Sequence, residues 1–224
     1  RIYEAVFKEA GIIKTEFVEE FLDLARLLTK GVIPKGNRLG ILTNSGGPGG
    51  MMANNAEKNE KLILPELSDN LQDDLKEMLI PTASVSNPVD ATFDLDPINY
   101  YVNVPTKLLQ SGEIDMLIIY GVFGLQSVMA TYLQNPQIRE NIEMNKAGAA
   151  QQKKDLTKLL IPPILQLSKE NSIPVLYINP QNFASAWSKN IRDKGAILFQ
   201  LWDRPVRCLG KLYTYAKYLN ALNA

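Results

Sequence analysis

The chain has 224 residues, of which 46% are hydrophobic and 21% are charged. This length supports one sizeable hydrophobic core and is too short for several domains of ordinary size. Its 24 basic residues cancel its 24 acidic residues, so no overall field attracts nucleic acid or an anionic membrane surface.

Cysteine usage and the pattern of apolar residues bear on the compartment. Cys208 is the only cysteine, which excludes a disulfide within the chain and favours a reducing interior. No run of about eighteen apolar residues occurs, and the first residues lack the apolar core of a signal peptide. We therefore expect a cytoplasmic protein. The chain opens at Arg1 inside a helical pattern, and we expect it to be a piece of a longer polypeptide.

Two helices are expected first. Residues 2–10 carry apolar side chains at helical spacing, and Gly11 is a typical residue at the C-terminal end of a helix. A second helical pattern follows, with Thr15 as its expected N-cap. Its expected apolar stripe consists of Phe17, Phe21, Leu24 and Leu28.

Short apolar runs bounded by turn residues then predict five buried strands. They lie at residues 38–43, 61–66, 113–124, 171–180 and 195–200. Helical patterns separate them at residues 51–59, 69–80, 98–112, 136–169, 183–195 and after Pro205. Ser68 is the expected cap of the second of these helices, Pro105 strains the third, and Pro162 interrupts the fourth. Residues 81–97 read as a long loop.

This alternation predicts an α/β fold, a flavodoxin-like open parallel sheet flanked by helices. We expect residues 1–36 to be a helical lead-in from a preceding domain and residues 37–224 to form the flavodoxin-like domain. In such a sheet the segments after Thr43, Tyr120 and Ile178 leave from the same edge and face a common crevice. The loop at 81–97 either folds over that crevice or is a plain surface loop.

The stretch TNSGGPGG at residues 43–50 joins the first strand to a helix. Glycines let backbone N–H groups approach a ligand, and a helix N-terminus favours anions. The stretch therefore predicts either a phosphate or carboxylate site or a tight strand-to-helix turn.

Several chemistries are excluded. Gly50 is followed by Met51 where a Walker-type loop needs Lys, and the dinucleotide fingerprint is absent, so ATP is bound by neither route. The chain has no histidine, which excludes Ser-His-Asp and Cys-His catalysis and histidine-ligated zinc within it. Asp90, Asp94 and Asp96 lack the glycine and terminal glutamate of a calcium loop, so we expect no metal site.

Five segments together resemble one family in order and spacing. They are YEAVFKEAGII at 3–13, EEFLDLARLL at 19–28, the glycine segment at 36–59, SNPVDATFD at 86–94 and RPVRCLGKLYTYAKYL at 204–219. The family is that of the ADP-forming acyl-CoA (acetyl-CoA) synthetases, in the succinyl-CoA synthetase superfamily. The likeness is to the carboxyl-terminal CoA-ligase domain of the alpha part.

The resemblance implies a ligase that interconverts acyl-CoA, ADP and phosphate with the free acid, CoA and ATP. Phosphate displaces CoA to give an acyl phosphate, a histidine takes the phosphoryl group, and an ATP-grasp domain or subunit passes it to ADP. That histidine lies upstream of the segment at 3–13, so this chain holds no catalytic residue and is expected to be inactive alone. The complete enzyme needs CoA, ADP or ATP and Mg, of which this chain alone binds none.

The resemblance also implies partners and site residues. The partners are the CoA-binding and phosphohistidine domains and the ATP-grasp part, within an oligomer. The expected phosphate-lining residues are Asn44, Ser45, Gly46, Gly47 and Gly49, with Asn87 and Asp90 in the adjacent loop. The alternative is a non-catalytic regulatory domain of the kind fused to protein acetyltransferases.

Overall fold

The computed structural model describes residues 2–92, 94, 96–121, 135–136, 156–180 and 183–222. Their centre is a five-stranded parallel sheet with the strand order β2-β1-β3-β4-β5. The strands are β1 (Leu39–Thr43), β2 (Val89–Asp90), β3 (Met116–Tyr120), β4 (Val175–Ile178) and β5 (Ile197–Phe199). This order and direction confirm the predicted open α/β sheet.

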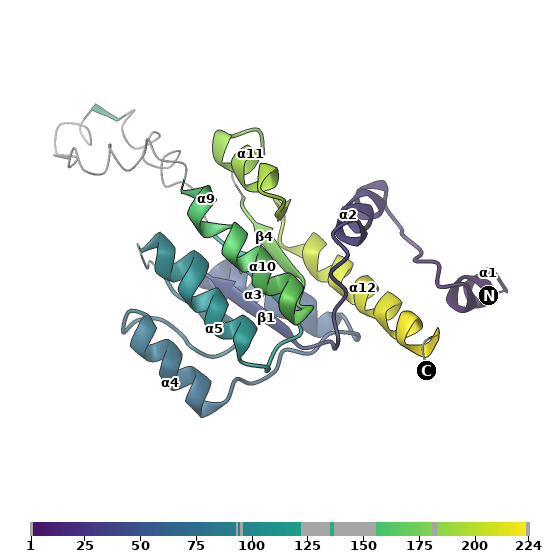
Figure 1. Ribbon diagram of the computed structural model, residues 1–224, viewed down its shortest axis with the longest axis horizontal. Helices are drawn as coiled ribbons and strands as arrows, with labels where there is room; N and C mark the ends of the chain where they lie inside the picture. Colours follow the sequence, from purple (N-terminus) through teal and green to yellow (C-terminus); the bar gives the residue numbers. More distant parts are fainter. Residues whose placement is uncertain are drawn as a thin grey trace.

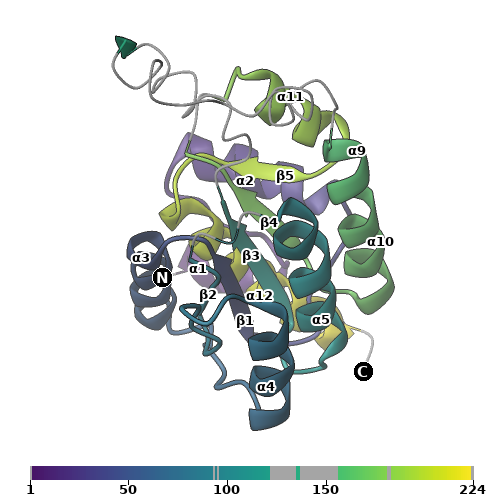
Figure 2. The ribbon, with the colours of Figure 1, turned by 90° about the vertical axis from the view of Figure 1, so that its left-hand side faces the viewer.

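Helices cover both faces of the sheet (Figures 1 and 2). The described α-helices are α1 (Ile2–Glu9), α2 (Val18–Leu28), α3 (Gly46–Lys58), α4 (Asp69–Met78), α5 (Val104–Gln110), α9 (Thr157–Leu160), α10 (Pro162–Asn171), α11 (Ala186–Asp193) and α12 (Asp203–Leu222). A π-helical turn, η1 (Asn99–Asn103), leads into α5. None of these helices is long and apolar enough to cross a membrane, among the residues described.

The core consists of two apolar layers, one on each face of the sheet. One layer joins strand residues such as Ile119 to α4, α5 and α10. The other joins strand residues such as Ile118 to α2, α3 and α12. Neighbouring strand residues point to opposite faces, and both faces are covered, so every position of β1 and β3 is buried.

The predicted strand at 61–66 is wrong. Only Ile63 pairs there, in an isolated bridge with Arg38, and the edge strand is instead Val89–Asp90, inside the predicted loop. Pro65 has no N–H to donate to a ladder. The Asn87 side chain takes the pairing positions beside it, because its Nδ2 donates to the Leu39 carbonyl (2.8 Å) and its Oδ1 accepts from the Ile41 N–H (3.1 Å).

The predicted start of the second helix is also wrong, and its predicted apolar stripe is wrong except for Leu24, which is buried. Thr15 is not its N-cap, since α2 begins after Phe17, which is extended. Phe17, Phe21 and Leu28 are exposed, and the buried residues of α2 are Glu20, Asp23, Leu24 and Leu27.

Ion pairs to α12 explain this orientation. Lys211 Nζ lies 2.7 Å from Glu20 Oε2, and Arg204 lies 2.7 Å from Asp23 Oδ2. These pairs turn the acidic residues of α2 inward beside Leu24 and Leu27, so α2 packs on the domain core.

Other predicted features agree with the structure. Gly11 has a φ of +66° after α1, and Ser68 caps α4 by accepting from the Leu71 N–H at 3.3 Å. Pro105, expected to strain its helix, instead lies in the first turn of α5, where proline is tolerated. Cys208 is buried, and burial raises the pKa of its thiol to about 12. Residues 122–134 and 181–182 of the segments predicted to face the crevice, and residues 137–155 of the helix predicted at 136–169, lie outside the described residues.

Candidate anion site at the start of α3

The candidate site lies where β1 turns directly into α3. The buried Thr43 fixes this turn: its Oγ1 donates to the Ser45 carbonyl at 2.8 Å and accepts from the Ser45 N–H at 3.0 Å. Ser45 is extended and is the N-cap of α3. The helix therefore begins at Gly46, earlier than the predicted residue 51, and the glycines form its first turn rather than a separate loop.

This first turn presents backbone donors. The Gly49 N–H donates to the Ser45 carbonyl at 3.2 Å and begins the helical ladder. The N–H groups of Gly46 and Gly47 precede that bond and have no intrahelical acceptor. Pro48 has no N–H, and the Ser45 side chain makes no capping hydrogen bond. Two amides and one hydroxyl thus stand at the positive end of a 13-residue helix.

The four glycines of this turn have different roles. A Cβ on Gly49 would lie 2.8 Å from Thr43 Cγ2, so Gly49 permits close packing of α3 on β1. A Cβ on Gly46 would lie 3.1 Å from Asp90 Oδ2. A Cβ on Gly47 or Gly50 would meet no heavy atom within 4 Å. Gly47 therefore borders open space at the helix end.

Asp90 brings a carboxylate to this helix end. It pairs with Thr43 in register at the end of β2, and its Oδ1 accepts from the Thr92 N–H at 2.8 Å. The backbone of Asp90 exchanges two hydrogen bonds with Ser84 at 2.8 and 2.9 Å. The loop is thus held so that Oδ2 faces Gly46.

Asn87 lies in the same loop, but its side chain is used within the fold. Besides the two bonds to β1, its Nδ2 donates to the Pro65 carbonyl at 3.2 Å. A cis peptide bond joins Asn87 to Pro88, whose Cβ lies 3.7 Å from the Cβ position of Gly49. Asn87 therefore positions the loop beside α3, and both donors of its side-chain amide are used within the fold. Asn44, by contrast, is half-buried between β1 and Ser45.

Sequence reasoning did not identify the tyrosines at the neighbouring strand end. The Tyr100 hydroxyl donates to the Tyr120 carbonyl at the end of β3. Tyr101 packs edge-on against Tyr100, and both are buried. Burial raises the pKa of the Tyr100 hydroxyl well above its ordinary value, so this hydroxyl remains protonated and acts as a donor that holds the strand end.

The acidic residues after β2 act as turn residues. Asp94 Oδ1 accepts from the Asp96 N–H at 2.9 Å, and Asp96 Oδ1 accepts from the Ile98 N–H at 2.9 Å. Asp94 Oδ2 also accepts from the Asn99 side chain at 2.8 Å. Across the described ranges, no three His, Cys, Asp or Glu side chains group as metal ligands.

Comparison with known proteins finds sequence similarity to ligase subunits. No protein-family model matches it. It is 39% identical to the alpha subunit of the ADP-forming acetate–CoA ligase II of Pyrococcus furiosus over 118 residues. This aligned stretch covers 53% of the chain and 25% of that subunit. The alpha subunit of ligase I from the same organism is 27% identical over 206 residues, covering 84% of the chain and 41% of that subunit.

Solved structures share the fold. PH0766 from Pyrococcus horikoshii superposes with a TM-score of 0.70 at 24% identity, over 97% of the chain and 44% of that protein. Acetyl-coenzyme A synthetase 1 of Ca. Korarchaeum cryptofilum gives 0.68 at 22% identity, over 100% of the chain and 43% of that protein. A structure of that synthetase in complex with phosphate and ADP gives 0.67 at 21% identity.

The two Pyrococcus furiosus subunits are much longer than the chain, which spans 25% and 41% of their lengths. It therefore corresponds to one part of them. The matched stretches and the shared fold agree with the family that the sequence motifs predict: the chain is homologous to the alpha subunits of ADP-forming acetate–CoA ligases.

Proposed function

We propose that the chain is the part of an ADP-forming acyl-CoA synthetase that directs the N-terminus of α3 at a phosphorylated histidine. The complete enzyme interconverts acyl-CoA, ADP and phosphate with the free acid, CoA and ATP. The observation that carries the proposal is the pair of amides of Gly46 and Gly47, which lack intrahelical acceptors. Gly47 borders open space, and Gly46 lies beside Asp90.

The electrostatics of a helix end suit this role. A helix N-terminus carries about half a positive charge, which stabilises an exposed anion by about 0.3–1 kcal/mol and a partly buried one by up to about 2 kcal/mol. Preorganised amides add directional hydrogen bonds to a phosphoryl group without reorganising during transfer. The Ser45 hydroxyl, at the N-cap of the same helix, supplies a third donor.

Asp90 limits how tightly this site holds an anion. Its carboxylate faces Gly46 and repels a phosphoryl group at close range. A site that passes a phosphoryl group between partners benefits from such a limit, because tight binding of the intermediate slows its release. In the proposed role, Asp90 tunes affinity and Asn87 holds the loop.

The remaining parts of the reaction lie outside this chain in the proposal. The chain contains no histidine, so the phosphoryl carrier belongs to a partner domain. CoA binds a further domain, and an ATP-grasp domain or subunit holds ADP or ATP with Mg. The alternative of a non-catalytic regulatory module is less favoured, because the Pyrococcus furiosus relatives are themselves named as ligase subunits.

The test compares two valine variants in the complete enzyme. Gly47→Val places a branched side chain over the two amides, and Gly50→Val places the same side chain later on α3, where space is equally open. Neither glycine has a φ in the left-handed region, so both variants are expected to fold. We expect Gly47→Val to lower turnover by about 10²-fold, as loss of a preorganised oxyanion donor does, and Gly50→Val to leave it within about twofold. Equal turnover of the two folded variants would contradict the proposed role.

A further inference from the structure

A second feature of the molecule lies at the opposite end of α3. A pocket of about 490 Å³ separates α1 and the segment after it from the C-terminal half of α12, and Lys61 closes one side. Lys61 follows the end of α3 at Lys58, and a 13-residue helix is about 20 Å long. The pocket is therefore distinct from the candidate anion site at Gly46.

The lining of this pocket is strongly cationic in a chain with no net charge. It holds five lysines and one acidic residue, namely Lys8, Lys14, Lys61, Lys211, Lys217 and Glu4. Lys14 pairs weakly with Glu4 at 3.7 Å, and Lys211 pairs with Glu20 at 2.7 Å. Lys8, Lys61 and Lys217 have no ion pair with any described residue. These three ammonium groups thus lack a carboxylate partner among the described residues, and Lys217 Nζ lies 5.0 Å from the centroid of the Tyr213 ring.

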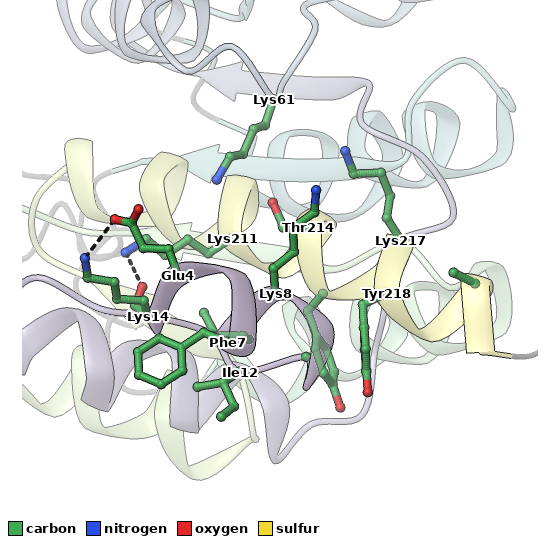
Figure 3. A pocket seen from close by; sticks show the side chains of 14 residues that line it. Glu4, Phe7, Lys8, Ile12, Lys14, Lys61, Lys211, Thr214, Lys217 and Tyr218 are labelled. Atoms are coloured by element: carbon green, nitrogen blue, oxygen red, sulfur yellow. Dashed lines mark hydrogen bonds and ion pairs between the residues drawn. The ribbon is translucent and has the colours of Figure 1, made fainter. Parts of the chain in front are cut away.

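The opposite wall is apolar and aromatic (Figure 3). Tyr215 and Tyr218 stack with ring centroids 6.3 Å apart and planes 22° apart. Gly11, with its φ of +66°, packs its backbone against the Tyr218 ring, where any Cβ would overlap it. In Figure 3, the ammonium ends of Lys8, Lys61 and Lys217 lie on one side of the pocket, and Phe7, Ile12 and Tyr218 lie on the other.

Helix α1 forms one wall of the pocket and buries no side chain against the rest of the fold. In Figure 1 it lies away from the sheet beside the C-terminal half of α12. Apolar side chains such as Phe7 therefore face the pocket without filling it. A ligand that fills the gap would bury these groups and compensate the lysine charges at once.

We propose that this pocket binds an aromatic organic phosphate of the nucleotide class. Ammonium groups on flexible stems bind phosphate as point charges, and a flat base stacks on the tyrosine wall. The volume falls within the range of small-molecule sites, about 300–1,000 Å³. Inorganic phosphate leaves the aromatic wall unused, and a neutral aromatic compound leaves the lysines unpaired. The inference does not depend on the proposed ligase function, and it departs from the expectation that the chain alone binds no nucleotide.

The test titrates ADP into the 224-residue chain at low salt while following amide shifts. We expect saturable shifts at residues 7–14, Lys61 and 211–218. Pyrophosphate carries the negative charge without an aromatic ring, and adenosine carries the ring without the charge. Each is expected to bind at least about tenfold more weakly than ADP.

Charge-reversal variants localise the binding. Lys8→Glu with Lys61→Glu is expected to weaken ADP binding by at least about tenfold. The control pair, Lys35→Glu with Lys189→Glu, changes two exposed lysines outside the pocket and is expected to change it by less than about twofold.

Three results would each overturn the inference. The first is an absence of shifts around the pocket at millimolar ADP. The second is an equal loss of affinity in the two double variants, which would indicate non-specific charge attraction. The third is a pair of findings: pyrophosphate binds as tightly as ADP, and Tyr215→Leu changes the affinity for neither. Together they would show that the aromatic ring of the ligand contributes nothing to binding.

Discussion

Asp90 Oδ2 lies 3.1 Å from the position that a Cβ would take on Gly46, the first residue of α3. The edge strand β2 therefore delivers an internal carboxylate to the helix end that also carries the unpaired amides. An alanine at position 46 would push against this carboxylate, whereas glycine allows the approach. We expect this pair of residues to affect both the stability of the turn and the affinity of the proposed site for an external anion.

Replacing Asp90 by Asn is expected to raise the affinity of the chain for phosphate by about three- to tenfold, because a like charge next to the bound anion is removed. The unfolding free energy is expected to fall by about 0.3–1 kcal/mol, since the carboxylate complements the helix dipole. Asp69→Asn is the matched control: Asp69 lies in the first turn of α4, so its loss affects stability alone. Phosphate affinity that falls in Asp90→Asn would show that the carboxylate assists binding.

Removal of the Asn87 side chain tests its role in holding the loop. Asn87→Ala leaves the Ile41 N–H and the Leu39 and Pro65 carbonyls without their partner. We expect the unfolding free energy, measured in urea, to fall by about 1–3 kcal/mol. Asn70→Ala, on the exposed face of α4, is expected to change it by less than about 0.5 kcal/mol. A loss of similar size in both variants would argue against the role of Asn87.

The contact between α2 and α12 makes stability depend on pH. Burial alone raises the pKa of Glu20, but hydrogen bonds from Lys211 and from the Glu16 N–H outweigh it and hold the pKa below its ordinary value. A lowered folded-state pKa stabilises the fold above the unfolded value of about 4.3, and this contribution is lost as the pH falls through the folded-state pKa. The stability advantage of the wild type over Glu20→Gln is therefore expected to shrink from pH 7 to pH 3.

The exposed neighbour Glu19 provides the control for this pH dependence. Glu19→Gln removes a carboxylate from the same helix without an ion pair to α12. Its unfolding free energy is expected to follow that of the wild type at each pH. If Glu19→Gln and Glu20→Gln give the same pH profile, the Lys211 contact does not carry the effect.

The absence of histidine predicts the behaviour of the chain toward ATP. Incubated with ATP and Mg, the 224-residue chain is expected to retain no acid-labile phosphoryl label, because it holds no imidazole to accept one. Label is expected on a histidine of the upstream domain when that domain and an ATP-grasp partner are added. Acid-labile label on the chain itself would refute the assignment.

Four of the five strands were predictable because their signals are local. Residues 39–43 and 116–120 are continuous apolar runs between turn residues, as strands buried on both faces require. The edge strand β2 was not predictable, since its two residues lie in a loop whose apolar residues follow no helical or strand spacing. Its place depends on the Asn87 amide bonding to β1, a contact between residues far apart in the chain.

The candidate site was predictable in its position but not in the roles of its residues. The glycine stretch marks a close approach of backbone, yet the sequence does not separate Gly49, which packs on Thr43, from Gly47, which borders open space. The orientation of α2 was equally hidden. Its apolar stripe implied burial of Phe17 and Phe21, whereas ion pairs with Lys211 and Arg204 turn other residues inward.

The most direct measurement of the central claim is a phosphate titration of the chain followed by amide shifts. If the start of α3 is a preorganised anion site, the amides of residues 44–50 and 87–90 shift together, with the largest changes at Gly46 and Gly47. The affinity is expected to be about millimolar, near 4 kcal/mol, and Gly47→Val is expected to abolish the shifts while Gly50→Val retains them. No movement of these amides at high millimolar phosphate would contradict the account and leave the glycines as a packing turn between β1 and α3.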